Sequence, residues 1–257
     1  MKSIYTTITP ETDYVDLVLF YDLHIGSKKC DFDSIKERID YVKDTKGAYA
    51  ILGGDLINNS TKTSVGDVYS EPLSPMQQIQ VAVSLFQPIK DKIIAITSGN
   101  HERRSYKTDG IDLTYFFATE LGIADVYDYT GCLNFISIEG RGVCKNPLMY
   151  TVYTVHGDGN GGRTIGGKAN GLERRADIVD ADIVIAGHTH QPFVTSRASY
   201  RINQRKKTIQ QFTQLLVNAA SSLNYEEYAE LYGLRPSSKL MPHILLNTFI
   251  KEAHALL

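Results

Sequence analysis

Five short apolar runs in this sequence each stop at an aspartate, asparagine or histidine, and this feature constrains the fold more than any other. The clearest run, Ile93–Thr97, reads as a buried strand. Each run is followed directly by a short block of polar residues and glycines. The five blocks are Ser98-Gly99-Asn100-His101-Glu102, Asp22-Leu23-His24, Gly53-Gly54-Asp55, His156-Gly157 and Gly187-His188-Thr189-His190. Ligands bind at the carboxyl ends of strands in an open α/β sheet, because the loops leaving the strands converge there. The five ends therefore predict one shared site.

Helical signals alternate with the first strands. Residues 31–45 place Ile35, Ile39 and Val42 at the spacing of a helix with one buried stripe, and Asp31 or Asp33 can cap it. Ser74-Pro75 predicts the start of a second helix, and residues 112–121 predict a third that ends at a glycine. Such crossovers predict parallel pairing of the strands they connect.

The second half of the chain is richer in strands. Short β runs are predicted over 135–138, 150–155, 182–186, 193–196, 215–218 and 244–249, with a helix near 171–179. Helical units followed by a strand-rich half indicate an α/β fold in which two sheets pack together with helices outside.

Size, charge and cysteine content limit the number of domains and the partners that we expect for this chain. The 257 residues predict a single domain over 1–257, and 27 basic against 29 acidic residues give a formal charge of -2, which indicates neither a nucleic-acid surface nor a membrane surface. Neither a signal-peptide core nor an apolar stretch of membrane-span length is evident. Three cysteines without a Cys-x-x-Cys pair fit reduced thiols. We therefore expect a cytoplasmic protein with no membrane partner.

The strand ends supply more metal ligands than one ion needs. A single zinc ion usually takes four ligands. The seven candidates are Asp22, His24, Asp55, Asn100, His156, His188 and His190. Two metal ions sharing a carboxylate account for this number. Mixed imidazole and oxygen ligands suit Mn, Fe, Zn or Co better than Ca or Mg. We expect two divalent metal ions, with Mn favoured.

The order of these blocks resembles a known family. Asp-x-His, Gly-Asp, Gly-Asn-His-Glu, His and Gly-His-x-His follow one another between Asp22 and His190, and this series is similar to the calcineurin-like metallophosphoesterase superfamily. The resemblance implies a four-layer α/β/β/α sandwich of two mixed sheets flanked by helices, with the metal site at one edge. It also implies that Asp55 bridges the two metals. By the same resemblance, the remaining candidates would divide into Asp22, His24 and His190 for the first metal, and Asn100, His156 and His188 for the second.

His101 is the candidate general acid. It follows the ligand Asn100 directly, so we expect it to point past the metals toward the leaving group, where protonation is typically worth about 10² to 10⁴ in rate. Its expected partner is Glu102 or Asn58. Many relatives in the family carry aspartate at the position of Asn58, so an amide there departs from the pattern.

The loop after His156 is rich in glycine and cations. Residues 162–169 nearly spell a phosphate-binding P-loop, but Ala169 replaces the Ser or Thr that would hold Mg²⁺. We interpret the segment as an active-site loop in which backbone amides, Arg163 and Lys168 bind substrate, together with Arg103; a plain surface loop is the alternative.

These features predict an enzyme, a metal-dependent phosphoric ester hydrolase of the EC 3.1 type. We expect a metal-bridging hydroxide to attack phosphorus, and we favour a phosphodiesterase acting on nucleotide or nucleic-acid substrates. Three alternatives stay open: a phosphomonoesterase or protein phosphatase, a DNA exo- or endonuclease of the repair type, and a non-catalytic scaffold on the same fold.

Overall fold

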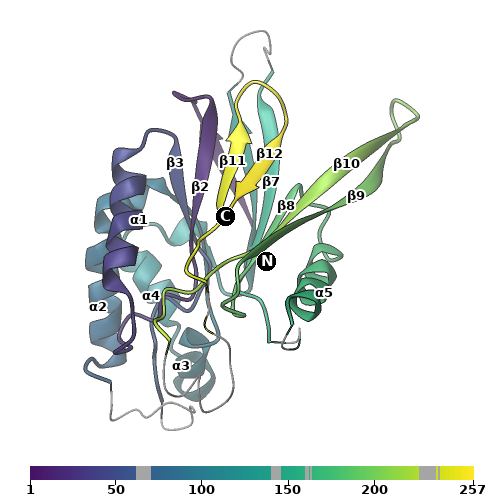
Figure 1. The fold of residues 1–257 in the computed structure, drawn as a ribbon. Helices are drawn as coiled ribbons and strands as arrows, with labels where there is room; N and C mark the ends of the chain where they lie inside the picture. The colour runs from purple at the N-terminus through teal and green to yellow at the C-terminus, as the bar shows by residue number, and fades with distance from the viewer. Residues whose placement is uncertain (62–70, 140–145, 160–161, 163, 226–235, 237) are drawn as a thin grey trace.

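Two six-stranded mixed sheets pack face to face in this protein. The computed structural model describes all residues except 62–70, 140–145, 160–161, 163, 226–235 and 237. Sheet A has the strand order β1-β6-β7-β8-β10-β9 and sheet B the order β12-β11-β2-β3-β4-β5. Helices flank the pair, so the predicted α/β sandwich of two mixed sheets is confirmed (Figure 1).

Sheet B holds three parallel strands that the sequence predicted, β2 (Tyr14–Phe20), β3 (Ala48–Leu52) and β4 (Ile93–Thr97), and a short fourth one, β5 (Tyr127–Asp128), that it did not. These four strands pair in parallel. Antiparallel β11 (His243–Asn247) and β12 (Ala253–Leu256) complete the sheet. Because β2, β3 and β4 run the same way, their carboxyl ends lie at one edge and bring three of the five polar blocks together.

Sheet A combines parallel and antiparallel pairs. Strand β1 (Lys2–Ile8), which the sequence did not predict, pairs in parallel with β6 (Gly131–Ile138). Strands β7 (Leu148–Val155), β8 (Ile183–Ala186) and β10 (Thr208–Asn218) follow in parallel contact, with β9 (Phe193–Asn203) antiparallel at the edge. β9 and β10 are much longer than the predicted strands and form a hairpin that projects from the body (Figure 1).

Of the described helices, α1 (Phe32–Asp44), α2 (Pro75–Phe86) and α4 (Leu113–Glu120) cover sheet B, and α3 (Glu102–Asp109) lies beyond its lower end (Figure 1). Short 3-10 turns lie at Gln87–Lys92 and Ala124–Val126. Asp31 caps α1 and Ser74 caps α2 in a capping box, as their sequences predicted. α3, which begins directly after His101, lies at the lower end of the molecule in Figure 1.

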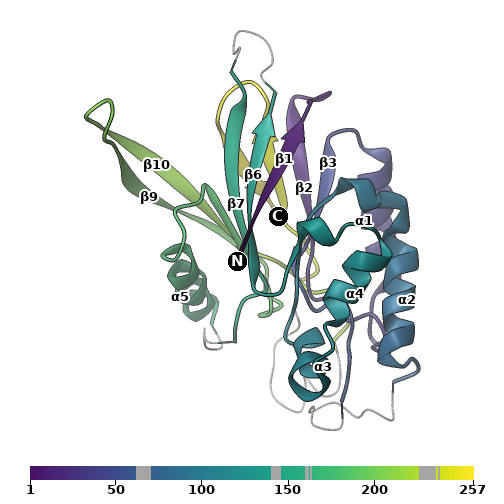
Figure 2. The same ribbon diagram turned by 180° about the vertical axis from the view of Figure 1, so that it is seen from behind.

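One described helix, α5 (Ile165–Ala176), packs on sheet A (Figure 2). The sequence placed this helix near 171–179, which is too late in the chain. Thr164 caps it by accepting a hydrogen bond from Gly167 N, and its buried side chains are Leu172 and Ala176. The first turn contains Gly166 and Gly167, and because glycine lowers helix propensity, this turn was not predicted from the sequence.

Three apolar layers hold the sandwich together. One lies between sheet B and its helices, a second between the two sheets and a third between sheet A and α5. None of the described helices is long and apolar enough to cross a membrane.

Candidate metal centre

Five of the candidate ligands adopt a left-handed backbone. Among the described residues, positive φ occurs at seven non-glycine positions, and the ligands among them are Asp22 (50°), His24 (50°), Asp55 (51°), His188 (66°) and His190 (55°). L-residues rarely adopt this region, and each instance costs about 1–3 kcal/mol. The strain lies where β2, β3 and β8 end and the chain turns sharply. Such clusters of strain are typical of functional sites.

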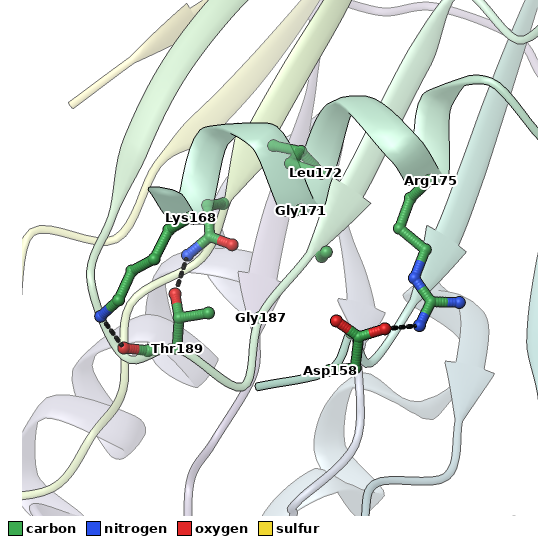
Figure 3. A pocket seen from close by; sticks show the side chains of 10 residues that line it. Asp158, Lys168, Gly171, Leu172, Arg175, Gly187 and Thr189 are labelled. Carbon is green, nitrogen blue, oxygen red and sulfur yellow. Dashed lines mark hydrogen bonds and ion pairs between the residues drawn. The ribbon is translucent and has the colours of Figure 1, made fainter. Parts of the chain in front are cut away.

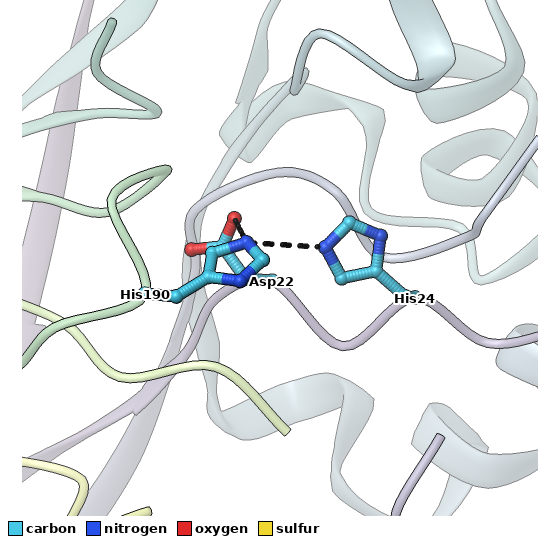
Figure 4. A group of neighbouring side chains, drawn as sticks. All are labelled: Asp22, His24 and His190. Carbon is cyan, nitrogen blue, oxygen red and sulfur yellow. Dashed lines mark hydrogen bonds and ion pairs between the residues drawn. The ribbon is translucent and has the colours of Figure 1, made fainter. Parts of the chain in front are cut away.

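The first cluster joins Asp22, His24 and His190, as Figure 4 shows. His190 Nε2 lies 3.3 Å from Asp22 Oδ1 and 3.4 Å from His24 Nε2. Metal–nitrogen bonds of about 2.1 Å in a tetrahedral site separate ligand atoms by roughly 3.4 Å. The spacing of these atoms therefore matches one tetrahedral cation.

Two buried polar atoms of this cluster, Asp22 Oδ1 and His24 Nδ1, have no hydrogen-bond partner among the described residues, whereas Asp22 Oδ2 accepts from His188 N at 2.9 Å. Two imidazole nitrogens that face each other repel unless a proton or a cation lies between them. A buried carboxylate oxygen without a donor and two facing imidazoles are the donor set that a divalent transition metal prefers, so these residues fit one.

The second cluster surrounds His156. Its Nε2 lies 2.9 Å from Asn100 Oδ1, 3.2 Å from His188 Nδ1 and 3.4 Å from Asp55 Oδ2. Its Nδ1 lies 2.9 Å from Gly53 O and donates to this carbonyl, which leaves the Nε2 lone pair free for a metal. These residues also fit a cation.

Asp55 lies between the two clusters. Its carboxylate belongs to one group of close donor atoms with His156 and His188 and to another with His24 and His101. Its Oδ1 accepts a hydrogen bond of 2.8 Å from His101 N. A carboxylate in this position can reach cations on both sides, which is what the bridging role expected from the resemblance requires.

Burial and mutual charge set the protonation of these groups. Burial opposes ionisation of Asp55, but His156 and His101 outweigh it and hold the pKa of Asp55 well below its usual value. Burial likewise opposes protonation of His156, but Asp55 raises the pKa of His156 to about 9. A cation competes with that proton for Nε2, so metal binding releases it. Burial lowers the pKa of His24 well below its usual value and also lowers that of His188.

His101 faces the clusters with its Nε2 atom, which lies 3.8 Å from Asp55 Oδ2. Its Nδ1 donates to the backbone carbonyl of Asn58. Burial lowers the pKa of His101, Asp55 opposes this effect and Arg104 adds to it. Of the two partners expected from the sequence, Asn58 is the one that orients the ring, and it does so through its backbone oxygen.

Glu102 has a different role from the one expected. Its buried carboxylate accepts hydrogen bonds from Gly99 N at 2.9 Å and from Asp55 N and Ile57 N at 3.0 Å each. Burial raises the pKa of Glu102 to about 7. The expected pairing with the His101 ring is wrong, because the Glu102 carboxylate instead binds backbone amides of the two loops that carry Asp55 and Asn100.

The expected substrate-binding cations separate in the structure. Arg103 points away from the clusters: its Nη2 donates to Tyr129 O at 2.6 Å and its guanidinium lies 4.9 Å from the Tyr129 ring centroid. The neighbouring Arg104 lies nearer, 3.4 Å from both Asn58 O and Asn59 O. Arg163 lies outside the described residues.

Lys168 lies beside the loop that carries the candidate ligands His188 and His190. Its Nζ donates to Thr189 O at 3.0 Å, between His188 and His190, and it lines a crevice of about 20 Å³ under α5 (Figure 3). Buried Asn218 also binds this loop, donating to Thr189 Oγ1 and Gln191 O at 2.8 Å each. Lys168 and Asn218 hold the strained loop in place.

Sequence reasoning missed several residues that support the site. Asn59 and Gln78 have fully buried polar side chains. Asn59 N donates to Gln78 Oε1, and Asn59 Nδ2 donates to His101 O. Their positions in a loop and on a helix face gave no signal. Tyr21, which directly precedes the candidate ligand Asp22, has the sequence pattern of one more residue of an apolar strand.

The ring of Tyr21 fills the space beneath two ligand loops. A Cβ atom on Gly53 would lie 1.8 Å from Tyr21 Cε1, and one on Gly187 would lie 2.5 Å from Tyr21 Cδ1. The ring is fully buried, and its hydroxyl has no hydrogen-bond partner among the described residues. Burial raises the pKa of Tyr21 well above its usual value.

We expect Tyr21→Phe to stabilise the protein by about 1 kcal/mol, because an unpaired buried hydroxyl costs about 1–3 kcal/mol. The matched control is Tyr150→Phe. Tyr150 is also buried, but its hydroxyl contacts Asn247 O at 2.8 Å and accepts from Glu252 N at 3.0 Å, so its loss costs about 1 kcal/mol. Urea unfolding of both variants checks the pair. A Tyr21→Phe protein less stable than Tyr150→Phe contradicts the prediction.

The matching family covers the whole cluster. The profile described as calcineurin-like phosphoesterase matches residues 22–192, which include every candidate ligand. The chain belongs to the calcineurin-like phosphoesterase family. Membership and the His/Asp clusters together support a metal-dependent phosphoesterase.

Solved structures are similar in fold at low identity. Vacuolar protein sorting 29 from Cryptosporidium parvum is 14% identical, with a TM-score of 0.45 over 95% of this chain and 97% of that chain. A predicted phosphoesterase from Streptococcus pneumoniae TIGR4 is 12% identical, with a TM-score of 0.38 over 95% and 90%. Vps29 complexed with Zn²⁺ from Entamoeba histolytica is 10% identical, with a TM-score of 0.38 over 94% and 97%. A search of curated proteins found no match.

Proposed function

We propose that this protein hydrolyses phosphodiesters with two divalent cations, and that His101 protonates the leaving oxygen. The observation that carries the proposal is the spacing of donor atoms: Nε2 of His190 and Nε2 of His156 each lie 2.9–3.4 Å from two or three further donors. Bound cations would neutralise the phosphate and supply a water of lowered pKa.

The protein's own residues support the remaining steps. Asp22 and Asp55 are the only anions among the seven candidate ligands, so a site loaded with two divalent cations stays positive and attracts phosphate. The Nε2 atom of His101 faces the same space and can carry the proton for the leaving oxygen.

The preference for a diester rests on the cations around the site. Arg104 lies against the loop beside His101, and Lys168 lies against the loop of His188 and His190. They come from different helices, α3 and α5. Two cations from separate elements suit a substrate that extends on both sides of the phosphorus, as a nucleotide or oligonucleotide diester does.

We expect Mn²⁺-dependent hydrolysis of bis-p-nitrophenyl phosphate to exceed that of p-nitrophenyl phosphate. The His101→Ala variant should lower kcat for the diester by about 10², because general acid catalysis is typically worth 10² to 10⁴ and p-nitrophenolate needs little protonation. Steady-state kinetics with metal analysis measure both effects. The matched control is His254→Ala, which removes a half-exposed histidine of β12 and should keep wild-type kcat.

The outcomes separate the competing functions. A preference for the monoester indicates a phosphatase, and cleavage of single-stranded or duplex DNA indicates a nuclease. A protein that binds no Mn, Fe or Zn and hydrolyses neither chromogenic ester contradicts the proposal and favours the scaffold.

A further inference from the structure

A chain of hydrogen bonds leads from the His101 ring to a carboxylate outside the metal clusters. His101 Nδ1 donates to Asn58 O, and the Asn58 side chain donates from Nδ2 to Glu71 Oε1. Glu71 Oε1 also accepts from Ser60 N at 3.2 Å, and its Oε2 accepts from Gln78 Nε2 at 2.6 Å. The one carboxylate thus receives hydrogen bonds from three residues.

This chain fixes three consecutive residues of the loop. Asn58 is held by its side chain and Ser60 by its backbone amide, both on Glu71. Asn59, between them, donates from its backbone N to Gln78 Oε1 at 2.9 Å. The loop has little freedom to shift relative to the start of α2, where Gln78 lies fully buried.

The same loop holds His101 at two points. Its ring is held through Asn58 O, and its backbone through Asn59 Nδ2, which donates to His101 O at 2.7 Å. The bond at Nδ1 keeps a proton there and turns Nε2 toward Asp55. A catalytic group displaced by about 1 Å can lose about 10² in rate.

We propose that Glu71 is a positioning residue that orients the general acid His101 through Asn58, with Gln78 bracing Glu71 from α2. The proposal rests on the function proposed above for His101. Of the three residues that donate to this carboxylate, Asn58 is the one whose backbone oxygen accepts from the His101 ring. Outer partners of this kind typically contribute about 10- to 100-fold to activity.

The Glu71→Gln variant tests the proposal. A glutamine offers one acceptor oxygen and one amide, so its amide must face the amide of either Asn58 or Gln78, and one of these bonds is lost. The matched control is Glu37→Gln, which makes the same substitution at an exposed position on α1.

The first readout is sensitivity to the leaving group. The wild type and the variants are assayed with Mn²⁺ on methyl p-nitrophenyl phosphate and methyl phenyl phosphate. The phenolate leaving group needs protonation more than the p-nitrophenolate does. We expect Glu71→Gln to lower kcat for the phenyl ester about tenfold and to leave the p-nitrophenyl ester within about twofold. His101→Gln should change the ratio in the same direction and further. The ratio does not depend on the fraction of folded enzyme, so a partly unfolded variant still answers.

The second readout needs no substrate. In ¹⁵N-labelled protein loaded with diamagnetic Zn²⁺, the Nδ1–H proton of His101, assigned with His101→Gln, should resonate far downfield. Glu71→Gln should move it upfield or broaden it, and Glu37→Gln should leave it unchanged.

Two results overturn the positioning role: an unchanged Nδ1–H resonance in Glu71→Gln, or a wild-type ester ratio in Glu71→Gln when His101→Gln alters it. A wild-type ratio in His101→Gln, or no hydrolysis by the wild type, instead counts against the proposed function. The resonance then still decides whether Glu71 positions the ring.

Discussion

The Asp55→Asn variant should lose at least about 10³-fold in kcat/KM for bis-p-nitrophenyl phosphate with Mn²⁺. Asp55 is buried between the two clusters and faces His156 and His101 at 3.4 and 3.8 Å. An amide offers one neutral oxygen in place of the two charged oxygens that the proposed bridging role requires. Lost cation binding of about 4 kcal/mol corresponds to about 10³ in rate.

Metal analysis and isothermal titration with Mn²⁺ should show weaker binding in this variant. Asp40→Asn, at an exposed position of α1, is the matched control and should keep wild-type kinetics and metal content. Wild-type activity of Asp55→Asn with full metal content would remove Asp55 from the bridging position.

The Gly99→Ala variant should damage both the fold and the site. A Cβ atom there would lie 2.0 Å from Asp55 Oδ1 and 2.1 Å from Asp55 N, far inside van der Waals contact. One of these atoms is backbone, so the ligand loop itself must move. We expect a loss of about 2–3 kcal/mol in the free energy of unfolding and about 10² in kcat.

The matched control, Gly166→Ala, lies in helix α5, and a Cβ atom there meets no atom within 4 Å. Alanine favours the helix, so this variant should be as stable as wild type or up to about 1 kcal/mol more stable. Urea unfolding and Mn²⁺ kinetics measure both variants. Equal behaviour of the two would mean that the close approach of Gly99 to Asp55 does not constrain the site.

Local sequence signals were sufficient for the frame of the fold. Asp31 and Ser74 predict the starts of α1 and α2, because a capping side chain binds backbone amides two or three residues further along the chain. The apolar runs announce β2, β3, β4, β7 and β8, whose ends carry the candidate ligands. The long hairpin of β9 and β10 was predicted only in its inner part, since its outer residues are exposed and lack the apolar pattern.

The same distinction between local sequence signals and tertiary contacts applies to the candidate site. By itself, the sequence determined which residues end the strands and which chemistry they offer, because ligand type and strand periodicity are local properties. Only the tertiary structure decided that Arg104 contacts the loop of Asn58, whereas Arg103 contacts Tyr129. It also decided that the Glu102 carboxylate accepts hydrogen bonds from backbone amides, and that Glu71 reaches Asn58. These contacts depend on side-chain direction and on segments far apart in the chain, which no local pattern encodes.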